Sequence, residues 1–304
     1  MNKTVLTTIL AATCGLLPSL AAAVDSCPPV RKFEPGVIST DDHWEWRLTF
    51  TPARNRAYWA TSVGWWPGTR ERSEIRTSTW QPTAGGWQPA TVASFSGQYA
   101  DFDPFVAPDG KTLYYSSMRP VDGVPNDDMD LWMVRRTATG WGEPVHLSVP
   151  SLDGYDELYP SIDNVGNLYF ARVKAPIPTE DVDIFRSRRQ ADGGFGPAER
   201  VPGGVNTAER WEFNPEISPD GRTMLFVRLD LPDAIPDEGH GFGDIYASRI
   251  TNGIAGPAKN LGPCVNTIWD EFHPTVLWER NLLFFAKDIG QPSDFYVTRL
   301  RLPK

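Results

Sequence analysis

Apolar and polar residues alternate along a stretch of the chain that recurs five times. One copy, WEFNPEISPDGRTMLFVR, runs from Trp211 to Arg228 and predicts two short antiparallel strands around a Pro-Asp-Gly turn, because a period of two is that of a half-buried strand. We number each copy from an anchor residue, and successive anchors are 56, 56, 55 and 59 residues apart. The anchors, which begin with the most divergent copy, are Leu48, Pro104, Pro160, Pro215 and Pro274.

A third and a fourth strand follow this pair in each of the first four copies. The third strands begin with an acid, as in DLWMVR and DIFRSR, and a Gly-rich turn leads into the fourth. A fixed period of this length with four strands per unit indicates a β-propeller, in which neighbouring units bury each other's faces. The sequence therefore predicts an all-β, five-bladed propeller of four-stranded antiparallel blades, with repeats at about 41–96, 97–151, 152–204, 205–264 and 265–304.

The fourth strand that the last copy lacks is found at the other end of the chain. The segment CPPVRKFEPGVIST (Cys27–Thr40) matches FGPAERVPGGVNT (Phe195–Thr207), which contains the fourth strand of the third repeat. We therefore expect residues 28–36 to complete the last blade and close the ring, which leaves no free sheet edge at the seam. Residues 24–304 then form a single propeller domain.

The first 23 residues have the pattern of a secretory signal peptide. Lys3 precedes an apolar run that ends in the small residues LAAA, and the run is too short to favour a membrane anchor. The net charge of −9 argues against nucleic acid or an anionic membrane surface as a partner. We expect a periplasmic or secreted protein with no integral membrane segment after cleavage. Lipidation of Cys27 stays open, although Asp25 makes VDSC a poor lipidation signal.

Cleavage leaves two cysteines, Cys27 and Cys264, in an oxidising compartment where cysteines often pair. If Cys27 begins the closing strand, it lies roughly 30 Å along the strand direction from the position equivalent to Cys264. A disulfide requires Cα atoms within about 7 Å of each other. We therefore favour two unpaired cysteines; the alternative, a disulfide, needs a bend near Pro28 and Pro29.

The repeats resemble the TolB-like (WD40-like) β-propeller repeat of exported bacterial proteins. The resemblance rests on the run PDGKTLYYSS, the acid-led third strand and the GWGEPV turn, and it covers about Val30–Leu302. The second and fourth copies match well, the third has DNVGN in place of the turn, and the first and fifth lack the turn. The resemblance implies a periplasmic propeller of binding or scaffolding type without a fixed ligand.

An acid lies three positions before the anchor in every copy, and a second acid opens every third strand on the same face. Because inner strands line a propeller's axis, we expect the first set to form a ring at one channel mouth. Two interpretations stay open: the acids pair with loop N–H groups and nearby bases, or they hold a cationic ligand or metal. The ring residues are Glu45, Asp101, Glu157, Glu212 and Glu271; the third-strand acids are Glu74, Asp130, Asp183, Asp244 and Asp294; the bases are Arg119, Arg172, Arg228 and Lys287.

The positions one before the anchors differ in chemistry between copies. An asymmetric ligand would explain the difference, and so would drift in a water-filled channel. With the acid ring, they make up the predicted ligand-binding residues. Trp65 and Trp66, on a long loop of the same face, are expected either to stack on a sugar or a proline-rich peptide or to cover neighbouring loops. The five positions are Arg47, Asp103, Tyr159, Asn214 and His273.

We expect a non-enzymatic binding or scaffolding protein of the cell envelope. An envelope protein, a peptide, a small molecule or a saccharide would engage the acid-rimmed mouth; no cofactor is expected, although a cation such as Ca²⁺ stays open. The alternative is a glycoside hydrolase or polysaccharide lyase, since FDPFVAPDGKTLYYSS loosely resembles the first strand of the arabinanase-like glycosidases. Its candidate acids are Asp103 with Glu157 or Glu212, because glycosidases need two carboxyl groups about 5 to 9.5 Å apart.

Overall fold

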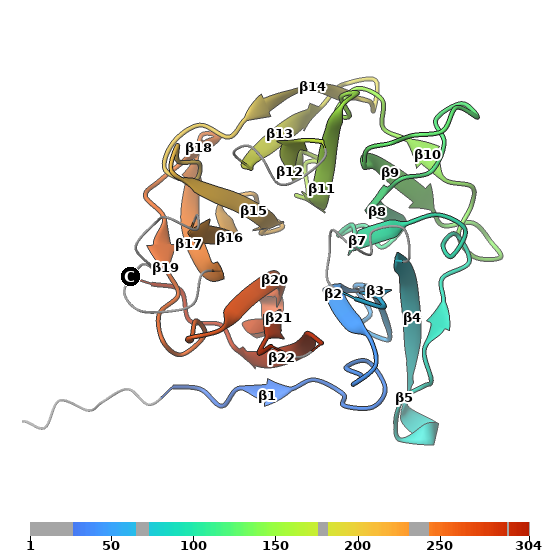
Figure 1. Ribbon diagram of the computed structural model, residues 1–304, viewed down its shortest axis with the longest axis vertical. Coiled ribbons are helices and arrows are strands. Elements are labelled where there is room, and N and C mark those ends of the chain that lie inside the picture. The colour runs from blue at the N-terminus through green and yellow to red at the C-terminus, as the bar shows by residue number, and fades with distance from the viewer. Residues whose placement is uncertain (1–26, 65–72, 176–181, 231–242, 291, 304) are drawn as a thin grey trace, which may run out of the picture.

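The structure is a computed structural model that describes residues 27–64, 73–175, 182–230, 243–290 and 292–303. Its strands form five separate antiparallel sheets arranged around one axis (Figure 1), which confirms the predicted five-bladed propeller. Each sheet has four strand positions, and in two blades the outermost position is divided into two short pieces. Among the described residues, no helix reaches the length and apolar character needed to cross a membrane. The predicted signal peptide lies outside these residues.

The strands follow the chain in order from the axis outward in blades 1 to 4, and blade 5 takes its outermost strand from the N-terminus. Blade 1 contains β2 (Trp44–Phe50), β3 (Arg56–Ser62), β4 (Ser73–Gln81), β5 (Gly86–Trp87) and β6 (Thr91–Val92). Blade 2 contains β7 (Asp101–Val106), β8 (Thr112–Ser117), β9 (Asp130–Arg135) and β10 (Val145–His146). Blade 3 contains β11 (Tyr155–Ile162), β12 (Leu168–Lys174), β13 (Asp183–Arg189) and β14 (Phe195–Arg200). Blade 4 contains β15 (Arg210–Ile217), β16 (Thr223–Asp230), β17 (Gly243–Thr251), β18 (Ile254–Ala255) and β19 (Lys259–Asn260). Blade 5 contains β20 (Asp270–Leu277), β21 (Leu282–Asp288), β22 (Asp294–Arg299) and the N-terminal β1 (Arg31–Lys32).

The last blade takes its outer strand from the N-terminus, as predicted. Strand β1 pairs antiparallel with β22. The loop after β1 also repeats a contact of blade 3: the hydroxyl of Ser39 accepts a hydrogen bond from the N–H of Phe295, as the amide oxygen of Asn206 accepts one from the N–H of Ile184. The sequence match between the two segments therefore reflects the same structural role.

Cys27 and Cys264 form a disulfide with their Cα atoms 5.1 Å apart, so the expectation of unpaired cysteines is wrong. The distance argument assumed a closing strand that extends back to Cys27. Strand β1 has only two residues, and the four residues from Cys27 to Val30 lie outside any strand. In Figure 1 the chain enters β1 from the side of blade 4, and Cys264 lies just after β19 of that blade. The disulfide therefore joins the closing segment to blade 4.

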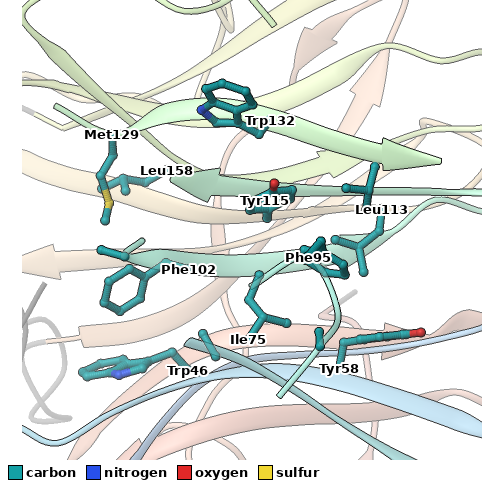
Figure 2. Packing of buried hydrophobic residues seen from close by; sticks show 14 of the residues in the cluster. Trp46, Tyr58, Ile75, Phe95, Phe102, Leu113, Tyr115, Met129, Trp132 and Leu158 are labelled. Carbon is teal, nitrogen blue, oxygen red and sulfur yellow. The ribbon is translucent and has the colours of Figure 1, made fainter. Parts of the chain in front are cut away.

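Apolar side chains fill the space between neighbouring blades. One cluster spans blades 1 to 3 and contains Trp46, Phe102 and Leu158, each two positions before its anchor (Figure 2). Large aromatic rings from the middle strands, such as Tyr58 and Tyr115, pack against the same cluster. Because each blade buries its faces only against the next blade, closing the ring completes the core.

Candidate functional site

We refer to the side of the propeller on which the inner strands β2, β7, β11, β15 and β20 begin as the strand-start face. The opposite side, on which they end, is the strand-end face. The predicted acid ring lies at the first of these faces and is fully buried: none of the five acids has solvent-exposed surface. The ring residues are Glu45, Asp101, Glu157, Glu212 and Glu271.

Each ring carboxylate accepts hydrogen bonds from the loop that leads into its own inner strand. The donors are backbone N–H groups, hydroxyl groups or both, at distances of 2.6 to 3.2 Å. These donors belong to Thr40, Ser96, Leu152, Thr207 and Thr267. We call these five acids and their loop partners the acid clamp layer, because each carboxylate fixes the connection between one blade and the next.

Four of the five carboxylates also pair with a base from the neighbouring middle strand or the loop after it. The nitrogen–oxygen distances are 2.7 Å for Arg119–Asp101, 2.7 Å for Arg172–Glu157, 2.9 Å for Arg228–Glu212 and 3.2 Å for Lys287–Glu271. These four bases belong to the first interpretation of the ring, in which the acids pair with loop N–H groups and nearby bases. The arrangement agrees with that interpretation, while a ligand role for the ring stays a prediction.

Glu45 is the exception in this layer. Its middle-strand neighbour is Thr61 rather than a base, and its Oε2 atom is buried without a hydrogen-bond partner. Burial raises the pKa of Glu45 to about 9, against the opposing effect of its hydrogen bonds from Thr40. Near neutral pH the side chain of Glu45 is therefore a protonated carboxylic acid.

The acids that open the third strands are also engaged, mostly with the outer strand of their own blade. Their partners lie within 3.0 Å and are polar or basic side chains. The contacts are Glu74–Arg76, Asp130–His146, Asp183–Arg200, Asp244–Asn260 and Asp294–Lys32. Four of these acids therefore hold the outer strand of their blade in place, whereas Glu74 pairs within its own strand.

The five chemically different residues one position before the anchors share a backbone conformation. Each has a positive φ, between 38° and 60°, and the pairing of each inner strand with its middle strand shifts in register at this point. Each is thus the extra residue of a β-bulge. Asp, Asn and His tolerate this left-handed conformation better than most residues. Three of the five positions, Asp103, Asn214 and His273, carry these types, a signal that sequence reasoning missed.

The bulge residues meet on the propeller axis, where they contact blades that are not neighbours. Arg47 of blade 1 donates a hydrogen bond of 2.8 Å to Glu216 of blade 4. The Nδ1 atom of His273 in blade 5 lies 3.8 Å from Oδ1 of Asp103 in blade 2, and its ring contacts that of Tyr159 in blade 3. Only Tyr159 among the bulge residues is partly exposed. We call the five bulge residues and Glu216 the axial layer.

Hydrogen bonds fix the protonation of the imidazole in this layer. The amide oxygen of Asn214 accepts the backbone N–H of His273 at 3.0 Å, so the amide nitrogen faces Nδ1 of the ring at 3.2 Å as a donor. The ring proton is therefore on Nε2. Burial, aided by the charge of Arg47, lowers the pKa of His273 well below its ordinary value. The ring is neutral at physiological pH.

Two buried carboxylates of the axial layer interact with one guanidinium. Burial raises the pKa of Asp103 to about 7 and that of Glu216 to about 7, and in both cases Arg47 opposes the shift. Asp103 accepts a hydrogen bond from the N–H of Tyr159 at 3.3 Å, while its other oxygen has no hydrogen-bond partner. Glu216 was not among the predicted site residues; it lies one position after its anchor.

The position directly after each anchor residue forms a further set of contacts between neighbouring blades. Thr49 and Ser161 accept backbone N–H groups of the following inner strands, and Glu216 accepts the N–H of Val276 at 3.1 Å. Thr275 donates to the carbonyl of Leu48. These contacts join four of the five neighbouring pairs of inner strands just beyond the bulges.

A cavity of about 280 Å³ opens beyond this set, toward the strand-end face. Every lining residue comes after its anchor in the sequence, and all five inner strands or their turns contribute. The floor includes Thr49, Glu216 and Thr275, and the walls are mostly apolar. None of the ten predicted ligand-binding residues lines this cavity. The wall residues include Phe105, Val106, Ile162, Ile217, Val276 and Trp278, with the prolines Pro52, Pro108 and Pro219.

The remaining candidates are distributed as follows. Of the proposed catalytic acids, Asp103 lies in the axial layer, whereas Glu157 and Glu212 lie in the acid clamp layer, each held by an arginine. Trp65 and Trp66 lie outside the described residues. Within the described part of the chain, no group of three or more His, Cys, Asp or Glu side chains is arranged to hold a metal ion.

Comparisons with known proteins support the fold. The chain matches no protein-family model and no curated protein sequence. Among solved structures it is similar to an exo-1,5-α-L-arabinanase from a bovine ruminal metagenomic library, with a TM-score of 0.53 and 10% identity over 88% of this chain and 96% of that one. It is also similar to an arabinanase of Bacillus subtilis, with a TM-score of 0.51 and 16% identity over 83% and 93% of the two chains.

A TolB-named protein of Agrobacterium tumefaciens is also similar, with a TM-score of 0.41 and 13% identity over 86% of this chain and 91% of that one. At these identities the likeness concerns the propeller fold alone. The predicted propeller is therefore confirmed, whereas its TolB-like subtype stays a prediction.

Proposed function

We propose that the protein is an exported propeller that binds a small ligand without transforming it, and that the ligand occupies the cavity at the strand-end face. The observation that carries the proposal is the contrast between the two ends of the inner strands. At their start every acid is engaged in holding the fold, and at their end residues of all five blades surround an open space. A concave, mostly apolar pocket with a few polar groups is the usual form of a small-molecule site.

The rival function is a carbohydrate-active enzyme, and the inner-strand acids argue against it. A glycosidase needs one protonated and one ionised carboxyl group, both in contact with the sugar. Glu157 and Glu212 each accept an arginine and a loop N–H group, and both are buried. Recruiting either of them for catalysis would break a clamp. One carboxylate oxygen of Asp103 has no hydrogen-bond partner. Neither of the other two candidate acids, however, would be available to Asp103 as the second carboxyl group.

A ligand screen on matched variants tests the proposal. Leu277→Trp adds an indole to a cavity wall, and Val165→Trp adds one to an exposed turn that does not line the cavity. Ligands that bind the folded protein raise its melting temperature by mass action. We expect hits from a library of amino acids, amines, peptides and oligosaccharides that persist in Val165→Trp and vanish in Leu277→Trp. Hits that survive in both variants would place the site elsewhere and refute the proposal.

Activity assays test the rival. Arabinan and other plant or microbial oligosaccharides should yield no new reducing ends and no unsaturated products with the purified protein. Turnover that Asp103→Asn abolishes would establish the enzyme and overturn the binding proposal.

A further inference from the structure

The axial layer holds more acid than base. Asp103 and Glu216 both interact with the single guanidinium of Arg47, and the neutral ring of His273 adds no positive charge. When both carboxylates are ionised, the layer carries one uncompensated negative charge in a buried place. Such a charge is costly unless an opposite charge or hydrogen-bond donors approach it.

Glu216 is the carboxylate that the cavity can reach. Its Oε2 atom accepts Arg47 and its Oε1 atom accepts the N–H of Val276, so each oxygen keeps a lone pair for another donor. The remaining 4% exposed surface of its side chain faces the cavity that it lines. A ligand therefore meets this carboxylate at the floor.

Two residues with hydroxyl groups, Thr49 and Thr275, come from other inner strands and line the cavity with Glu216. Thr275 donates its proton to the carbonyl of Leu48 and keeps its lone pairs, and Thr49 accepts one N–H and keeps a second lone pair. Strands β2, β15 and β20 thus each supply one oxygen acceptor. A primary ammonium group has three N–H donors and no acceptor, which matches this set.

The walls suit an apolar body attached to such a group. Phe105, Ile162 and Ile217 are buried apolar residues that line the cavity, and the three prolines of the turns border it. At the rim, Arg54 pairs with Glu279, so neither contributes an uncompensated charge. The apolar surface that a ligand buries here adds to its binding free energy.

We propose that the cavity binds a primary organic ammonium ion with a compact apolar or aromatic body, whose ammonium group contacts Glu216, Thr49 and Thr275. This inference rests on the proposed function and names the ligand class of the same cavity. The ammonium ion supplies the positive charge that the axial layer lacks when both carboxylates are ionised, and the protein's net charge of −9 favours its approach.

A hydrogen-bond acceptor on the ligand is the competing chemistry, because of Trp278. The indole N–H of Trp278 is buried, makes no hydrogen bond of normal geometry and lies near the carboxylate of Glu216, where it lowers that group's pKa. A neutral ligand with an acceptor would bind this N–H. A ligand carboxylate would also have to approach Glu216, and like charges at this distance repel.

Three probes of nearly equal shape separate these chemistries: phenethylamine, phenethyl alcohol and phenylacetate. Calorimetric titration of the full chain near neutral pH should show the amine binding at least about tenfold more tightly than the alcohol, with no binding of the acid. Because the ammonium ion favours the ionised carboxylates, amine binding should also release protons. Proton release is measured by repeating the titration in buffers of different ionisation enthalpy.

Variants test whether the probes bind in the cavity and whether Glu216 causes the preference for the amine. Leu277→Trp should abolish binding of all probes, and Val165→Trp should preserve it. Glu216→Gln alone leaves Arg47 buried without its partner, so the double variant Arg47→Met/Glu216→Gln, which removes both charges, is the informative change. It should bind the alcohol as before and lose the preference for the amine.

The outcomes distinguish this inference from the proposed function. If the alcohol binds as tightly as the amine and Leu277→Trp abolishes both, the ammonium inference is wrong and the binding function stands. If no probe binds while the library screen returns hits that Leu277→Trp abolishes, the ammonium inference is again wrong and the binding function again stands. If neither the probes nor the library bind the cavity, both proposals fail.

Discussion

The acid clamp layer and the axial layer lie two positions apart on the same five inner strands, yet they differ in how strictly they repeat. In the acid clamp layer every blade carries an acid and uses it to hold the incoming loop. In the axial layer the five bulge residues share a backbone conformation and differ in chemistry.

The positions of the two layers explain this difference. A clamp serves its own blade, so each copy can keep the same residue. Residues on the axis contact one another across the ring, and five identical charged side chains there would repel each other. Repetition therefore marks the groups that build each blade, and variation marks the one place that all blades share.

The largest expected effect tests the closure of the ring. The disulfide joins Cys27, at the start of the closing segment, to Cys264, which lies between blades 4 and 5 and three residues before the clamp residue Thr267. Cys27→Ser/Cys264→Ser should lower the free energy of unfolding by about 4 kcal/mol, because the disulfide closes a very long loop of the unfolded chain. Urea unfolding measures the change. Ligand binding in the cavity of the folded variant should be unchanged, and a lost affinity would contradict the separation of the two regions.

Removing the arginine of the axial layer should have the next largest effect. Arg47 is fully buried, so Arg47→Met leaves Glu216 and Asp103 without a cation and should cost about 3 kcal/mol of unfolding free energy. Arg47→Met/Glu216→Leu removes the ion pair and should recover most of that loss, since apolar side chains replace buried ion pairs well. Chemical denaturation of the single and double variants gives the coupling. Equal losses in both variants would mean that the pair is not what stabilises the axis.

A clamp acid should matter somewhat less than Arg47, because the base that it leaves behind reaches water. Glu157→Ala strands Arg172, whose side chain is 12% exposed, and removes the acceptor for the N–H of Leu152. We expect a loss of about 2 kcal/mol in unfolding free energy from these two broken contacts. Hydrogen exchange should show faster opening of the loop that precedes β11. An unchanged loop would argue that the acid has another role.

A dependence of stability on pH separates Glu45 from the other clamp acids. Its pKa is raised to about 9 in the folded protein and stays near its ordinary value of 4.5 in the unfolded chain. Between these values the folded state binds more protons than the unfolded state, so the free energy of unfolding falls as the pH rises. Glu45→Gln removes this titration and should therefore be stabilising relative to the parent protein at about pH 8.

The same substitution should change the free energy of unfolding much less at about pH 5, where Glu45 is protonated in the folded protein and partly protonated in the unfolded chain. Glu157→Gln is the matched control. Burial also raises the pKa of Glu157, to about 8, but Arg172 opposes this shift and donates a hydrogen bond to Glu157, so the substitution strands Arg172 and should be destabilising at both pH values. Melting curves of the two variants and the parent protein across this range test the contrast. A Glu45→Gln variant that is less stable at the higher pH would show that the carboxylate is ionised.

The repeat predicted a large part of the architecture. Copies of DFDPFVAPDGKTLYYSS and its relatives specify short strands and turns locally, and their number equals the number of blades. The closing strand was also predictable, since the segment before Thr40 matches the one before Thr207 and both threonines clamp a glutamate. The bases that pair with the acids were visible because they end the adjacent strands.

The disulfide, the bulges and the cavity were not predictable in the same way. Cys27 pairs with Cys264 because the chain leaves the sheet before Arg31, and no local pattern states how long an outer strand is. Glu216 looked like an ordinary position after its anchor. Its role depends on Arg47, which lies 169 residues away and on a blade that does not adjoin its own.

The sequence by itself determined the strand order, the blade number and the closure of the ring, because each follows from local propensity and from the repetition of one unit. The tertiary structure alone decided which acids are engaged, where the axis is filled and where it opens. Those properties arise from contacts between different blades, and such contacts depend on the distances and orientations that exist only after the ring has closed.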